Sequence, residues 1–98
     1  MFVKLIKSYR LVVAVCDSEL LGKRFEEGNF QLDVKENFYK GEEKSEEETI
    51  EFLKRMSQED ATFNIVGEKS VKAALEAGII NESWVGQVQG VQFALVLL

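Results

Sequence analysis

The residues best suited to chemistry lie in the segment Val66-Gly67-Glu68-Lys69-Ser70. A β-branched run ends at Val66 and helix-forming residues begin at Glu68, so the glycine stands at a predicted strand-to-helix turn. The first N–H groups of a helix lack partners inside the helix and can bind an anion, and Lys69 adds positive charge. The segment is not a Walker A loop, because the Gly-Lys-Ser/Thr order is absent. The alternative is a plain turn in which Glu68 faces the helix dipole and would repel a phosphate.

The basic tripeptide Gly22-Lys23-Arg24 is the second candidate. Basic and aromatic side chains near the N-terminus could extend it into a patch for RNA phosphates and stacked bases: Lys4, Lys7, Arg10, Tyr9 and Phe25. The alternative is a solvated loop in which Lys23 and Arg24 face Glu26 and Glu27. The expected RNA or anion site consists of Lys23, Arg24, Gly67, Lys69 and Ser70. It requires the fold to bring the two segments together.

The other reactive side chains do not favour catalysis or a metal. The sequence has no histidine, the commonest general base, and its one cysteine, Cys16, precludes the usual zinc sites. The neighbouring Asp17 would raise the pKa of the Cys16 thiol rather than activate it. The glutamates of residues 42–51 lack the alternating ligands of a calcium loop and are typical of a solvated helix start. We therefore expect no catalytic residue, no metal and no cofactor.

Composition limits the possible partners. Ninety-eight residues, 46% of them apolar, predict one globular domain over residues 1–98. The net charge of −5 argues against a basic nucleic-acid binder, and no DNA partner is expected. No apolar stretch approaches the length of a membrane span, and no signal peptide is recognisable. We expect a cytoplasmic protein without a membrane partner.

The N-terminal half of the chain predicts strands. Residues 2–7 and 11–16 are β-rich runs joined by three residues, which is typical of a hairpin. Residues 25–34 predict a half-buried third strand, with Phe30, Leu32 and Val34 facing inward. Residues 35–44 form a looser stretch that Phe38 and Tyr39 are expected to hold against the body of the protein.

The C-terminal half predicts two helices among further strands. Ser45 and Glu48 form a capping box that starts a helix ending near residue 58. A second helix is predicted over residues 68–77, with Gly78 as its left-handed cap. Strands are predicted over residues 62–66, 84–89 and 91–98. The expected fold is a single α+β domain: an N-terminal β-hairpin and a mixed sheet of about five to six strands with two helices.

The apolar C-terminal strand cannot face water on both sides. Residues 93–98 read Phe-Ala-Leu-Val-Leu-Leu. Either this strand is central in the sheet, or a second copy of the chain covers its outer side and forms a homodimer. In the second case the acidic helix face could steer a basic partner.

Several segments together resemble a known family. They are Val13-Ala-Val-Cys16-Asp17, Glu19-Leu-Leu-Gly22-Lys23, Phe25-Glu-Glu-Gly28, Asn64-Ile-Val-Gly67-Glu68-Lys69-Ser70-Val71 and Glu76-Ala-Gly78-Ile79. The chain resembles a group of small archaeal proteins catalogued as domain of unknown function four hundred and twenty-four. This chain has Gly90-Val-Gln-Phe93 where relatives have Gly-Val-Pro-His, so a role of that histidine would not transfer.

The resemblance implies a cytoplasmic archaeal protein without an established activity, loosely associated with translation as an RNA-binding accessory. The leading hypothesis is a non-catalytic module that docks on RNA or a ribonucleoprotein. The alternative is a protein-interaction module or homodimer. A third possibility is an enzyme or small-ligand binder with a pocket at the Gly67 helix start.

Overall fold

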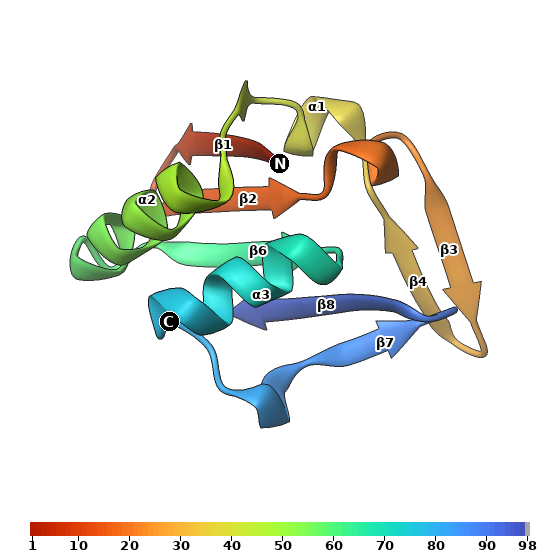
Figure 1. The fold of residues 1–98 in the computed structure, drawn as a ribbon. Helices are drawn as coiled ribbons and strands as arrows, with labels where there is room; N and C mark the ends of the chain where they lie inside the picture. Colours follow the sequence, from red (N-terminus) through yellow and green to blue (C-terminus); the bar gives the residue numbers. More distant parts are fainter. Residues whose placement is uncertain (98) are drawn as a thin grey trace.

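The computed structural model describes residues 1–97 as two β-sheets with three α-helices (Figure 1). The main sheet has six strands in the order β5-β1-β2-β6-β8-β7, and β3 and β4 form a separate two-stranded sheet. The strands are β1 (Phe2–Lys7), β2 (Leu11–Cys16), β3 (Arg24–Glu27), β4 (Phe30–Asp33), β5 (Glu42–Glu43), β6 (Thr62–Val66), β7 (Gly86–Val88) and β8 (Val91–Val96). The helices are α1 (Glu36–Tyr39), α2 (Glu46–Gln58) and α3 (Glu68–Ala77), with the 3-10 turns η1 (Ser18–Leu20) and η2 (Glu82–Trp84). The predicted α+β class is confirmed.

The sheet is mixed. β2 and β6 pair in parallel, and the other pairings of the described strands are antiparallel. β1 and β2 form the predicted N-terminal hairpin, with Phe2 opposite Cys16 and Lys7 opposite Leu11. No helix within residues 1–97 is long and apolar enough to cross a lipid bilayer.

Helices α2 and α3 cover one face of the main sheet (Figure 1). Alternate residues of the strands point to this face, and they meet the apolar stripes of the two helices there. Leu53 of α2 and Val71 of α3 are buried against Val13, Phe63 and Ile65 of the sheet. This is the larger of the two hydrophobic cores.

The opposite face of the sheet carries a smaller core at one end. Ala14, Cys16 and Val66 are buried there beneath Val34 and Tyr39, together with partly buried side chains of α1 and the β3–β4 hairpin. Tyr39 is 6% exposed and its ring meets that of Phe38 edge-on, so residues 35–44 are held against the domain as predicted.

Local signals set the ends of both long helices. The Ser45 N–H donates to Glu48 Oε1 at 2.9 Å, and the Glu48 N–H donates to Ser45 Oγ at 3.2 Å, which confirms the capping box. The first of these hydrogen bonds favours the ionised carboxylate and so lowers the pKa of Glu48 below its ordinary value of 4.5. Helix α3 has the predicted bounds, and Gly78 ends it in the left-handed conformation with φ 75°.

The prediction of one half-buried strand over residues 25–34 is wrong. These residues form a hairpin outside the main sheet, turning at Gly28 with φ 60°. Phe30 is 64% exposed instead of buried, because it starts the second strand beside the turn, where the centre of its ring lies 6.4 Å from that of Phe93. The strand predicted over residues 84–89 is likewise shorter and begins at Gly86, after turn η2. Residue 98, the end of the last predicted strand, lies outside the described residues.

Candidate functional site

The two predicted segments lie at the same end of the main sheet. Because β2 and β6 are parallel, their last residues, Cys16 and Val66, are side by side. The Asp17 N–H donates to the Val66 carbonyl at 3.0 Å, directly before residues 18–24 and 67–70 diverge. The segments of Lys23 and Lys69 therefore start from adjacent strand ends, but the Gly22 N–H and the Lys23 carbonyl pair with Val34, which is buried on the sheet face opposite α3.

An internal carboxylate occupies the start of helix α3. Asp17 Oδ1 accepts the Ser70 N–H at 2.8 Å and the Ser70 hydroxyl at 2.7 Å, while Oδ2 accepts the Lys69 N–H at 3.1 Å. Asp17 is 4% exposed and Ser70 is fully buried. The chain thus places its own anion where the sequence offered a site to an external one.

Gly67 makes this arrangement possible. Its φ of 109° and ψ of 153° lie in a region that is almost confined to glycine. A Cβ at this position would lie 2.3 Å from Asp17 Cγ, so no larger residue leaves room for the carboxylate. The Gly67 N–H donates to the Gln92 carbonyl at 2.8 Å. The Gly67 N–H and the Ser70 N–H and hydroxyl therefore donate to groups within the domain and do not face solvent.

The predicted cations at this end are exposed among acidic groups. Lys23, Arg24 and Lys69 lie on the surface, and Arg24 Nη2 pairs with Glu26 Oε1 at 2.7 Å, as the solvated-loop alternative predicted. A hollow of about 200 Å³ lies beside Gly67 at the start of α3. Its lining includes three carboxylates, one amide, and apolar or glycine residues: Asp17, Glu19, Glu68, Gln92, Leu20, Val91, Gly67 and Gly90. The excess of carboxylates weakens the attraction of this hollow for phosphate.

Lys7 and Arg10 of the first hairpin do not join this group. Lys7 pairs with Leu11 at the turn end of the hairpin, whereas Cys16 and Asp17 lie at the other end. A six-residue strand spans about 20 Å, so Lys7 and Arg10 lie roughly that far from Asp17. Lys7 and Arg10 are therefore too far from this end of the sheet to belong to the extended patch proposed from the sequence.

Cys16 is inert by its environment. The side chain is fully buried, and burial together with the Asp17 charge raises the pKa of the thiol to about 11. Within residues 1–97, no group of three or more Cys, Asp or Glu side chains is arranged to hold a metal ion.

We expect Cys16 to resist alkylation in the folded protein. At pH 8 the thiol is mostly protonated and shielded, so iodoacetamide should modify it at least about a hundredfold more slowly than in the urea-unfolded chain. Mass spectrometry of timed samples measures both rates. Equal rates in the folded and unfolded protein would contradict the buried placement.

A second candidate surface lies on the sheet face opposite α2 and α3. From the sequence, only its apolar C-terminal strand was recognised. The smaller core covers one end of this face, and the rest is uncovered. There Ile6 and Val12 are cross-strand partners that belong to neither core, and Leu95 is 50% exposed. Leu97, just beyond β8, is 73% exposed. We call Ile6, Val12, Leu95 and Leu97 the open sheet face.

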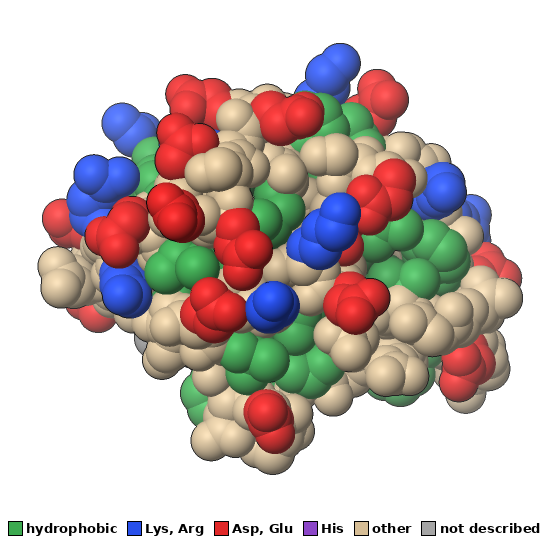
Figure 2. Space-filling model, viewed as in Figure 1, with side chains coloured by type: hydrophobic (Ala, Val, Ile, Leu, Met, Phe, Trp, Pro, Cys, Tyr) green, Lys and Arg blue, Asp and Glu red, His purple; other side chains and the backbone are tan. Residues whose placement is uncertain are grey.

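Strand β8 explains this exposure. It lies between β6 and β7, as the first of the two sequence alternatives required, and Ala94 is buried beneath the helices. Because side chains alternate along a strand, Leu95 points to the opposite face, which no helix covers at that end. The helix-covered face differs in character: acidic side chains are spread over it (Figure 2).

Comparisons with known proteins add the family and a fold relative. A family model described as "Protein of unknown function (DUF424)" matches residues 6–98. A crystal structure of an uncharacterized conserved protein from Methanopyrus kandleri is similar with a TM-score of 0.87 and 23% identity, covering 97% of this chain and 88% of that chain. No curated protein matches the sequence. At this identity the structural likeness establishes the fold alone.

Proposed function

Because the chain belongs to the DUF424 family, whose function is unknown, we propose a role from its own geometry: a non-catalytic protein-interaction module of the cytoplasm. In this proposal the open sheet face binds a second copy of the chain. The observation that carries the proposal is the exposure of Leu95 and Leu97, at 50% and 73%, on the same sheet face as Ile6 and Val12, from which β6 separates them. Several exposed apolar side chains on one face of a folded domain mark interaction surfaces more often than a single one does.

A second copy is the simplest occupant of this face. The apolar side chains stand on an antiparallel pair of strands and on β8, and a two-fold axis would place the same patch against itself. The acidic helix face points away from such a seam, so the net charge of −5 would not be concentrated within it.

We expect the protein to sediment as a dimer, at twice the 11.1 kDa of one chain. Leu95→Lys should weaken dimerisation by at least about a hundredfold, because it buries a charge in an apolar seam. Trp84→Lys is the matched control, since Trp84 is 54% exposed on turn η2 and lies outside the open sheet face. A wild-type monomer at every concentration, or equal effects of the two substitutions, would refute the proposal.

RNA docking is the second candidate function. The segments of Lys23 and Lys69 follow adjacent strand ends, which supports it, whereas Glu19, Glu68 and the Arg24–Glu26 ion pair weigh against it. The test is to isolate the protein from its host at low and moderate salt and sequence any bound RNA. RNA shed by Lys23→Glu and Lys69→Glu, but retained by Lys54→Glu on α2, would favour this function over the first. Protein free of RNA would argue against it.

A further inference from the structure

We propose that the outer edge of β1, together with the groove beside it, binds an extended acidic segment of a partner protein by β-strand addition. This inference rests on the proposed role as an interaction module, but it concerns a different surface and a different partner. The surface consists of the backbone of Leu5 and Lys7 and the side chains of Val3, Leu5, Phe52 and Arg55. We call it the β1 groove.

The edge of β1 is only partly paired. Strand β5 covers Phe2 and Val3, and no other strand among the described residues pairs with this side of β1. Met1 and Lys44 exchange hydrogen bonds between their backbone groups at 2.8 and 3.3 Å, so the backbone of Met1 faces β5. Backbone groups of antiparallel strands alternate in direction, so those of Leu5 and Lys7 also face outward, away from β2. An incoming strand would find two N–H donors and two carbonyl acceptors there.

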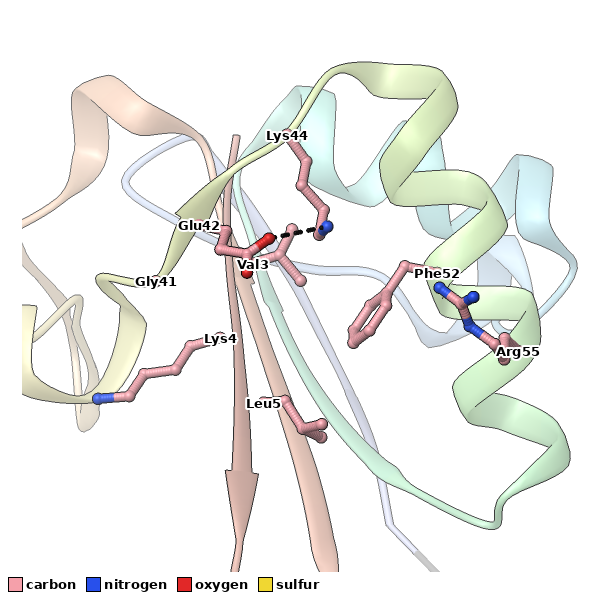
Figure 3. Close-up of a pocket in the computed structure, with 8 residues that line it drawn as sticks. All are labelled: Val3, Lys4, Leu5, Gly41, Glu42, Lys44, Phe52 and Arg55. Carbon is pink, nitrogen blue, oxygen red and sulfur yellow. Dashed lines mark hydrogen bonds and ion pairs between the residues drawn. The ribbon is translucent and has the colours of Figure 1, made fainter.

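An apolar groove lies beside these backbone groups. It encloses about 360 Å³ between β1 and helix α2. The side chains of Leu5 and Phe52 point into this space, whereas the Lys4 side chain points away from it (Figure 3). The Lys4 ammonium donates to the Asn37 carbonyl at 2.7 Å on the other side of the sheet. The floor of the groove is therefore apolar and suits one aliphatic side chain of the bound strand.

Two cations at the groove, Lys7 and Arg55, favour an acidic strand, although Arg55 also lines an adjoining hollow with Glu47, Glu48 and Glu51. The Arg55 guanidinium lies 5.6 Å from the centre of the Phe52 ring, and no carboxylate of residues 1–97 lies within ion-pair distance of it. Glu42, the carboxylate that lines the groove, is paired with Lys44 at 3.2 Å. Lys7 is exposed on the open edge. If a second copy paired through this edge, the Lys7 side chains of the two copies would come close together and repel each other. An acidic partner therefore fits better.

The geometry specifies the pattern of the segment. Residues two apart on a strand share a face, so an aliphatic side chain that enters the groove places the residue two positions away on the side of α2. A carboxylate at that position can reach Arg55, which gives a charge-assisted hydrogen bond as well as the backbone ladder. The partner is thus an extended stretch in which aliphatic and acidic residues alternate with polar ones.

The probe for this proposal is a capped peptide of sequence Thr-Leu-Thr-Glu-Thr-Glu, with Thr-Leu-Thr-Lys-Thr-Lys as its charge control. We expect NMR titration of the 15N-labelled protein to shift the amides of Leu5 and Lys7, and saturation with the acidic peptide to slow their hydrogen exchange at least about tenfold. The lysine peptide should bind at least about tenfold more weakly. Absence of these shifts, or equal binding of the two peptides, would overturn the proposal.

Two variants separate backbone pairing from charge. Lys7→Pro removes the outward N–H, which β2 does not use, and Lys7→Thr removes the same charge while keeping the N–H. Lys7→Pro should bind the acidic peptide about tenfold more weakly than Lys7→Thr. Arg55→Glu should reverse the preference between the two peptides. Equal affinities of the two Lys7 variants for the acidic peptide would refute strand addition. An unchanged peptide preference in Arg55→Glu would refute the charge argument.

The two proposals can fail independently. Leu95 lies on the sheet face opposite the helices, so Leu95→Lys should leave peptide binding unchanged. The same substitution should lower the sedimentation mass from dimer toward monomer. Arg55→Glu should change peptide preference and leave the mass unchanged. A peptide that binds a monomeric protein would support the β1 groove while removing the homodimer.

Discussion

Replacement of Gly67 by alanine is expected to destabilise the fold by about 2 to 6 kcal/mol, a large part of the stability of a domain of this size. An L-residue at φ 109° and ψ 153° is strained by about 1 to 3 kcal/mol. The new Cβ would also displace the Asp17 carboxylate, which lies 2.3 Å from that position, and so remove the cap of helix α3 for a further cost of about 1 to 3 kcal/mol. Urea unfolding followed by circular dichroism measures the loss.

Gly28→Ala is the matched control for this substitution. Gly28 also has a positive φ, 60°, but among the described residues beyond its two chain neighbours no atom lies within 4 Å of the position of its Cβ. Its replacement should cost only about 1 kcal/mol, from backbone strain alone. Equal destabilisation by the two substitutions would show that contact with Asp17 does not contribute.

Removal of the Asp17 carboxylate is expected to have the second large effect. Asp17→Ala would leave the N–H and hydroxyl of buried Ser70 without their acceptor and would expose the Lys69 N–H. The loss should be about 2 to 4 kcal/mol, which exceeds the usual cost of a surface helix cap because the site is buried. Asp17→Asn, which keeps one acceptor oxygen, should lose less.

Asp17→Ala also tests the anion site predicted from the sequence. With the carboxylate gone, the start of α3 offers free donors, so phosphate should raise the unfolding midpoint of the variant more than that of the wild type. Glu19→Ala is the control, because it removes an exposed carboxylate from the same hollow without touching the helix cap. Equal responses of all three proteins to phosphate would show that Asp17 does not occupy an anion site.

Features that depend on neighbours within a few residues could be predicted from the sequence. The Ser45–Glu48 capping box, the bounds of helix 68–77 and the first hairpin all agree with the structure. In each case the hydrogen bonds that define the feature join residues close in the chain, so the local residue types determine it. The same reasoning identified the segments of Lys23 and Lys69 as candidates.

Features that depend on pairing between distant segments could not be predicted. The alternation of Phe30, Leu32 and Val34 indicates a strand but not its partner, and a hairpin at a sheet end leaves Phe30 exposed where a strand within the main sheet would bury it. The β1 groove was missed for the same reason, since Leu5 and Phe52 are far apart in the sequence.

The candidate site illustrates this division. The sequence by itself determined that a glycine would start α3 and that free N–H groups would follow it, because both depend on the local chain alone. Only the tertiary structure decided which group those N–H donors bind. The parallel pairing of β2 with β6 places Asp17 next to Ser70, although 53 positions separate them in the sequence. An acceptor that far along the chain leaves no signal in the segment it caps, because proximity there is created by the sheet and not by the chain.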